Sequence, residues 1–223
     1  MNKAIVFDLD GTLVDSAPDL MDAHNYVMQK YGYHQKQVSD IRHLAGRGAA
    51  NMILNSLREE DKKFDTNIHK KMTEEFINFY RENISKKSQI IKGAVDFLKW
   101  GKSQNITLAI CTNKMESLAK KLLKEINLIE FFDYIAGADT FEYRKPDPRH
   151  LTNILEILDV KKENSIMVGD SETDSETARS AKIHFVLVKG GYTEKDQKHI
   201  YHNHLINDFT EMQAIISKMK FLN

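Results

Sequence analysis

A short apolar run near the start of the chain ends abruptly at two acidic residues. The run covers Ala4 to Phe7, and Asp8, Asp10 and Gly11 follow it directly. Consecutive β-favouring apolar residues predict a strand that is buried on both faces, as in a parallel sheet covered by helices. We expect Asp8 and Asp10 to lie side by side where the chain leaves this sheet, and Gly11 to let the backbone turn closely there.

Two acidic side chains at one strand end repel each other unless a positive charge compensates them. A hard divalent cation such as Mg²⁺ takes oxygen ligands and keeps coordination positions for a phosphate and for water. These residues therefore predict a metal site. The alternative interpretation of Asp8-Leu9-Asp10 alone is a strand followed by an ordinary polar turn.

The apolar residues between Ser16 and Ile84 recur at helical spacing, without a strand pattern. Ser16-Ala17-Pro18-Asp19 reads as a capping box that begins the first of these helices. A helical insert of about 70 residues after one strand does not extend a sheet, so it predicts a separate small helical unit. We expect an α/β core formed by residues 1–15 and 85–223, and a helical cap formed by residues 16–84.

After Gly93 strand and helix patterns alternate. This alternation predicts a doubly wound parallel sheet with helices on both faces, in which ligands bind beyond the carboxyl ends of the strands. Polar residues follow two of the later predicted strands, and a lysine precedes a helix: these are Thr112 with Asn113, Asp170 with Asp174, and Lys145. Taken singly they are also typical of a strand-end hydroxyl, a helix cap and a surface lysine.

Together with Asp8 and Asp10, these groups occur in the order and at roughly the separations of four known motifs. The sequence resembles the haloacid dehalogenase-like (HAD) phosphohydrolases over nearly its whole length, and Asp8-Leu9-Asp10-Gly11-Thr12-Leu13 is similar to their first motif. The stretches Val14 to Leu20, Lys145 to Pro148 and Gly169 to Ser171 look most like the phosphoglycolate phosphatase-like branch.

The resemblance implies a role for each acidic residue. Asp8 would attack phosphorus to give an aspartyl-phosphate, and Asp10 would act as general acid and then as general base. Asp8, the backbone carbonyl of Asp10, and Asp170 would hold Mg²⁺. Asp174, one helical turn further, would support these ligands from behind.

The other candidate residues would bind the substrate. Thr112 and the backbone of Asn113 would hold phosphoryl oxygens, and Lys145 would neutralise charge that grows in the transition state. In the predicted cap, Arg47 lies between two glycines, and its planar fork suits a carboxylate or phosphate. The resemblance makes this loop a specificity loop, and the alternative is a turn with a solvated arginine.

The composition of the chain limits the partners and the cellular location that can be expected. The 223 residues carry 32 basic and 32 acidic side chains, so nothing indicates a nucleic acid or an anionic membrane as a partner. The single Cys111 excludes an internal disulfide, and we find neither a leader pattern nor an apolar run of membrane-spanning length. We expect a cytoplasmic monomer or homodimer. His199, His202 and His204 cluster in the sequence, but their spacing does not match a zinc pattern.

We therefore expect a Mg²⁺-dependent phosphatase of a small phosphorylated metabolite, with 2-phosphoglycolate as the substrate. Alternatives within the same fold are a pyrophosphatase, a nucleotidase, a sugar phosphatase and a sugar-phosphate mutase. A dehalogenase is disfavoured because its relatives lack the second aspartate, seen here as Asp10. An alternative from another class is a phosphate-binding regulatory protein without turnover, and the intact set of Asp8, Asp10, Lys145 and Asp170 argues against it.

Overall fold

A six-stranded parallel sheet forms the centre of the protein. The computed structural model describes residues 2–41, 48–60, 65–193 and 195–219. In sheet order, the strands are β5 (Tyr134–Ala136), β4 (Thr107–Cys111), β1 (Ala4–Phe7), β6 (Ser165–Gly169), β7 (His184–Val188) and β8 (His204–Ile206). The predicted fold class is confirmed, although β8 was not predicted: His204-Leu205-Ile206 has only two apolar residues between asparagines, which gives no strand pattern.

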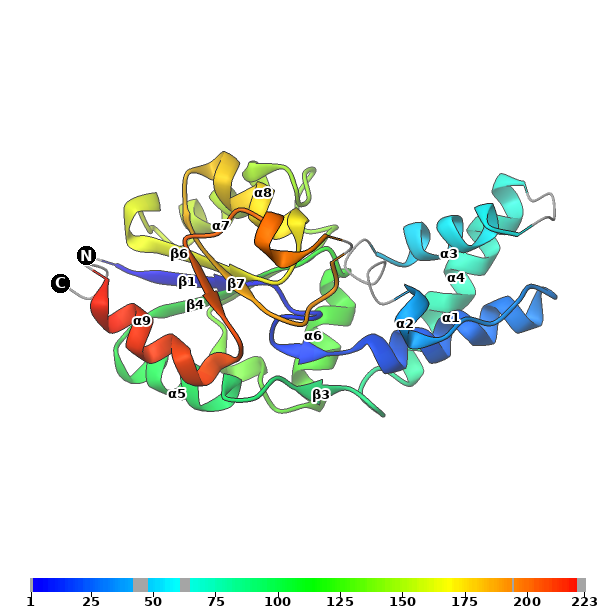
Figure 1. The fold of residues 1–223 in the computed structure, drawn as a ribbon, viewed down its shortest axis with the longest axis horizontal. Coiled ribbons are helices and arrows are strands. Elements are labelled where there is room, and N and C mark those ends of the chain that lie inside the picture. Colours follow the sequence, from blue (N-terminus) through cyan, green and yellow to red (C-terminus); the bar gives the residue numbers. More distant parts are fainter. Residues whose placement is uncertain (1, 42–47, 61–64, 194, 220–223) are drawn as a thin grey trace.

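Strand β1 lies inside the sheet between β4 and β6, and it is covered on both faces. Ile5 and Phe7 pack into one apolar cluster, whereas Ala4 and Val6 pack into another on the opposite face. Helices α5 (Ala94–Ser103), α6 (Glu116–Glu125) and α9 (Met212–Lys218) contribute to the first cluster, and α7 (Pro148–Ile157) and α8 (Glu172–Ala181) to the second (Figure 1). This two-sided burial explains why the run has no polar residue.

A group of helices extends from one end of the sheet (Figure 1). They are α1 (Ala17–Lys30), α2 (Val38–Ile41), α3 (Ala49–Arg58) and α4 (Thr66–Glu82). The chain leaves the core through β2 (Val14–Asp15) and returns through β3 (Gln89–Ile90), and these two strands pair with each other in an antiparallel ribbon. The two segments that connect the sheet to the group of helices are therefore held together. The remaining elements are short 3₁₀ helices, η2 (Ile129–Phe131), η3 (Lys162–Asn164), η4 (Gln197–His199) and η5 (Phe209–Glu211).

The start of α1 differs from the predicted capping box. The Ser16 side chain makes no cap hydrogen bond, and its hydroxyl donates to Asp10 instead. Asp19 accepts hydrogen bonds from the backbone of Lys87 and Ser88, next to β3. The prediction was wrong because both side chains have partners outside the helix. In the described part of the chain, no helix combines the length and apolar character that crossing a membrane requires.

Candidate active site

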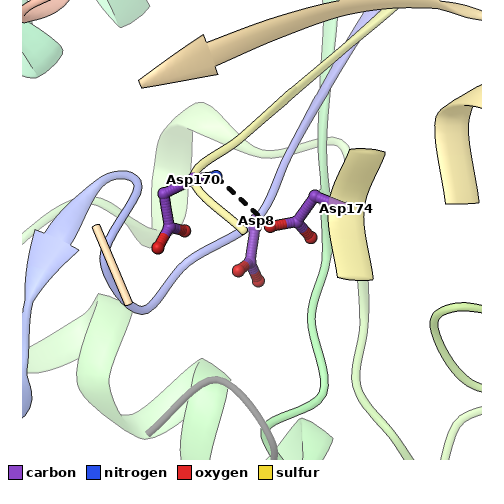
Figure 2. A group of neighbouring side chains, drawn as sticks. All are labelled: Asp8, Asp170 and Asp174. Carbon is purple, nitrogen blue, oxygen red and sulfur yellow. Dashed lines mark hydrogen bonds between the residues drawn. The ribbon is translucent and has the colours of Figure 1, made fainter. Parts of the chain in front are cut away.

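Two aspartates from strand ends and a third from a helix converge beyond the sheet. Figure 2 shows the carboxyl groups of Asp8, Asp170 and Asp174, which offer oxygen atoms within 4.8 Å of one another. Asp8 follows β1, Asp170 follows β6, and Asp174 lies in the first turn of α8. Gly11 permits this convergence, because it has a φ of +86° and a Cβ there would lie 2.5 Å from Asp170 Oδ2.

Lys145 lies between two of these acids. Its Nζ is 2.8 Å from Asp8 Oδ1 and 2.6 Å from Asp174 Oδ1. The lysine and all three aspartates are buried. The other oxygen of Asp174 accepts from the backbone N–H of Asp170 and from the backbone and hydroxyl of Ser171. Asp174 thus orients Lys145 and the Asp170 loop at the same time.

Burial and mutual repulsion disturb the protonation of this cluster. Burial raises the pKa of Asp8 to about 6, although Lys145 lowers it. Burial, together with the charges of Asp174 and Asp8, raises the pKa of Asp170 well above its usual value. Burial opposes the charge on Lys145, but Asp174 and Asp8 outweigh it, so the pKa of Lys145 is raised. Three acids beside one ammonium leave an excess of negative charge.

A divalent cation fits this excess. The two oxygens of Asp174 are occupied by Lys145 and by the donors described above, so Asp8 and Asp170 are the carboxylates that can turn toward a cation. Asp170 also accepts from the Thr12 hydroxyl and from the backbone N–H of Tyr192, both at 2.6 Å, and a carboxylate has lone pairs left after two such bonds. The donor set consists of oxygens only, as hard divalent cations prefer.

The second aspartate of the first motif has a different environment. Asp10 is buried, and both of its carboxylate oxygens contact Lys114 Nζ, at 2.7 and 2.8 Å. The Ser16 hydroxyl also donates to it. The Lys114 ammonium lies 4.7 Å from the centre of the Tyr80 ring on α4. Sequence reasoning missed Lys114, although it directly follows Thr112 and Asn113.

The predicted phosphate-binding residues lie beside the acids. Thr112 is buried after β4, and its hydroxyl accepts from the backbone N–H of Lys114. Asn113 donates from its amide to the carbonyl of Lys145, which joins the two loops. Its Oδ1 is buried, and no described residue is its hydrogen-bond partner. The structure therefore brings the predicted site residues of the α/β core together. Arg47, the predicted site residue of the cap, lies outside the described residues.

A cavity of about 210 Å³ opens between the helical group and the sheet. Asp8, Asp10 and Thr112 line it from the core, and Met52, Phe76 and Tyr80 from α3 and α4. Gly48, the last residue of the predicted specificity loop, also lines it, whereas Arg47 lies outside the described residues. The apolar wall and the acidic floor together suit a small polar substrate shielded from water.

His150 supports the Lys145 loop and makes the folded state sensitive to acid. Its Nδ1 accepts from the backbone N–H of Lys145 at 3.1 Å, which requires a neutral ring. Burial, with the charge of Lys145, lowers the pKa of His150 from 6.5 to about 4. Because the folded pKa is the lower one, the unfolded chain takes up the proton first, and stability is lost as pH falls from 6.5 toward 4.

We expect this loss to be measurable with His150→Leu. The difference in unfolding free energy between the wild type and this variant should shrink by on the order of 2 kcal/mol between about pH 7.5 and about pH 4.5, measured by urea denaturation. The comparison removes contributions from other groups, which titrate alike in both proteins. A difference that stays constant over this range would contradict the assignment.

The three C-terminal histidines do not form a metal site among the described residues, where the aspartate cluster is the group with suitable spacing. His202 Nδ1 donates to the carbonyl of Ile200, and the ring of His204 lies 5.1 Å from that of His184. Sequence reasoning also missed Tyr192, which connects Asp170 to the start of the helical group. Its backbone N–H donates to Asp170, and its hydroxyl donates to Asp15 of β2 and accepts from the backbone N–H of Ala17.

Comparison with known proteins identifies the family of this chain. The family described as haloacid dehalogenase-like hydrolase matches residues 5–188. The chain belongs to the haloacid dehalogenase-like hydrolase family. It is 36% identical over 214 residues to the phosphoglycolate phosphatase of Mesorhizobium japonicum, covering 96% of this chain and 94% of the relative. It is also 36% identical over 220 residues to that of Agrobacterium fabrum, covering 98% and 94%.

A solved structure gives the same result. The crystal structure of a predicted phosphoglycolate phosphatase from Haemophilus somnus superposes with a TM-score of 0.92 at 25% identity, covering 96% of this chain and 97% of the other. The predicted membership of the HAD superfamily, in its phosphoglycolate phosphatase-like branch, is therefore confirmed.

Proposed function

We propose that this protein hydrolyses 2-phosphoglycolate to glycolate and phosphate with Mg²⁺ as its metal. The observation that carries the proposal is the buried Asp8 carboxylate, held by Lys145 beside Asp170 at the floor of the cavity between the sheet and the helical group. The family and relatives of the chain identify it as a phosphatase that acts on a small phosphorylated substrate with a divalent metal. The names of the relatives support the substrate.

Asp8 carries out the first step in this proposal. An oxygen of its carboxylate attacks phosphorus in line, the bond from phosphorus to the ester oxygen breaks, and a phosphoaspartate forms. Asp10 donates a proton to the departing alkoxide, so that glycolate leaves as the alcohol. Lys145 neutralises the charge that builds up on the phosphoryl group, and the contact of Lys145 with Asp174 fixes its ammonium in place for this task.

The second step reverses the role of Asp10. It takes a proton from a water molecule, which attacks the phosphoaspartate, and the bond from phosphorus to Asp8 breaks. Thr112 and the backbone N–H of Asn113 hold phosphoryl oxygens in both steps. A bound Mg²⁺, held by Asp8, Asp170 and the backbone carbonyl of Asp10, would neutralise the phosphoryl oxygens and orient them.

We also propose that residues 16–84 act as one cap over this site. The cavity has walls from both parts, and the β2–β3 ribbon carries both crossings between them. A unit hinged at one short ribbon can open for substrate and close to exclude water. Asp19 ties the first turn of α1 to the returning strand, which keeps the two crossings together during such a motion.

A panel of phosphorylated compounds tests the substrate. With Mg²⁺, we expect kcat/KM for 2-phosphoglycolate to exceed that for ethyl phosphate, a hexose phosphate, a nucleoside monophosphate and pyrophosphate by at least about tenfold. A cavity of about 210 Å³ with polar and apolar walls favours a small ester over a bulky one. If pyrophosphate or a sugar phosphate gave the highest value, the proposed substrate would be wrong while the phosphatase chemistry stood.

A further inference from the structure

Lys114 is a buried lysine at the site with no role in the steps given above. The described lining of the cavity contains two cationic side chains, Lys114 and Arg144, of which Arg144 is exposed and Lys114 is only 8% exposed. Its ammonium makes a two-pronged contact with Asp10 and faces the Tyr80 ring. Lys114 therefore stands next to the proposed acid and on the wall of the cavity.

The charge balance of this pair changes during the proposed reaction. Lys145 has two carboxylate partners, Asp8 and Asp174, whereas Asp10 is the single carboxylate that contacts Lys114 within the described residues. To act on the ester oxygen, the Asp10 carboxyl group must turn toward it and away from the Lys114 ammonium that it now contacts. It then no longer neutralises Lys114, and a buried ammonium without a counter-charge is costly. The reaction needs a replacement anion at this position.

The proposed substrate brings such an anion. In 2-phosphoglycolate one carbon separates the ester oxygen from the carboxylate, so an ester oxygen within reach of Asp10 places the carboxylate beside the ammonium that Asp10 contacts. We propose that Lys114 binds this carboxylate in exchange for that of Asp10, and so selects phosphate esters that carry a carboxylate on the ester carbon. This inference rests on the proposed function and names the group that recognises the non-reacting end of the substrate.

Tyr80 and Ser16 hold Lys114 and Asp10 in the positions that this exchange of carboxylates requires. The Tyr80 ring holds the ammonium by a cation–π contact from α4, so that it keeps its position when Asp10 leaves. Ser16 donates to Asp10 from the start of the helical group. Asp10 thus gives up contacts on both sides when it turns, and only an anionic leaving group compensates the loss at Lys114.

The kinetic test compares two esters that differ in one group. In ethyl phosphate a methyl group replaces the carboxylate of 2-phosphoglycolate. We expect Lys114→Met to lower the ratio of kcat/KM for 2-phosphoglycolate to that for ethyl phosphate by about 30-fold or more, because the substrate charge loses its partner. Lys114→Arg, which keeps the charge, should retain most of this preference. A fall of less than about fivefold for Lys114→Met would overturn the inference.

Two control variants test whether the effect depends on the position of Lys114 or only on the loss of one positive charge. Lys102→Met removes an exposed lysine of α5 that pairs with Asp133, and it should leave the ratio unchanged. Arg144→Met removes the exposed cation at the cavity, and we expect a change of less than about threefold. If Arg144→Met abolished the preference and Lys114→Met did not, Arg144 would be the recognition residue. A wild type without any preference for 2-phosphoglycolate would contradict the proposed substrate instead.

A binding test covers the case in which Lys114→Met does not fold. The uncleavable analogue 3-phosphonopropionate carries the carboxylate, and propylphosphonate lacks it. In Asp10→Asn the competing carboxylate is gone, so the preference for 3-phosphonopropionate in calorimetric titration with Mg²⁺ should rise by at least about fivefold over wild type. Adding Lys114→Met to Asp10→Asn removes the buried charge as well, and should abolish the preference. An unchanged preference in Asp10→Asn would overturn the exchange.

Discussion

Asp8→Asn should reduce kcat for 2-phosphoglycolate by at least about a thousandfold while the protein stays folded. The amide has nearly the same shape as the carboxylate, but it lacks the anionic oxygen that attacks phosphorus. Folding should survive, because burial already disfavours the charge of Asp8 and Lys145 keeps its contact with Asp174. Initial rates with saturating substrate and Mg²⁺, together with a thermal unfolding curve, measure both expectations.

A matched variant separates chemistry from charge. Asp22→Asn makes the same chemical change on α1, where Asp22 is partly exposed and pairs with Lys87, and it should leave kcat unchanged. Acid quenching of the wild type during turnover should trap a phosphoryl group on Asp8. Retention of more than about a tenth of wild-type kcat by Asp8→Asn, a loss below ~1.4 kcal/mol, would rule out the covalent route.

Such a test could be designed from the sequence, because parallel strands bring their carboxyl ends to one edge. Asp8, Thr112 and Asp170 each directly follow a strand of the central sheet, and periodicity located these strands well enough to predict that the three residues meet. The apolar character of β1 carried most of this information. A strand covered by helices on both faces has few alternative positions in a fold.

The residues that sequence reasoning missed depend on contacts between distant segments. Ser16 has the local pattern of a helix cap, yet its hydroxyl donates to Asp10, and Asp19 accepts from residues 68 and 69 positions away. The position of the Lys114 ammonium depends on Asp10 and on Tyr80 from another helix. A local pattern cannot reveal these contacts. Strands of two residues, such as β2, are equally invisible to periodicity.

Removing the divalent metal should stop turnover without unfolding the protein. The cluster places the carboxylates of Asp8 and Asp170 close together, and burial raises the pKa of both. A divalent cation relieves this repulsion, so we expect EDTA to lower kcat to about a hundredth or less, and Mg²⁺ to restore it. Mg²⁺ should also raise the unfolding temperature, since it binds the folded state.

The identity and location of the metal can be tested together. Oxygen-only ligands should make Mg²⁺ the best activator and Mn²⁺ a workable substitute, whereas Ca²⁺ should inhibit, because its larger and looser shell misplaces the attacking oxygen. Asp170→Asn should raise the Mg²⁺ concentration needed for half activation at least about tenfold. Replacing His199, His202 and His204 together by glutamine should leave that concentration unchanged, because among the described residues none of them belongs to the group that could hold a metal. Full activity in EDTA would exclude a catalytic metal, and a shift caused by the triple histidine variant would place it elsewhere.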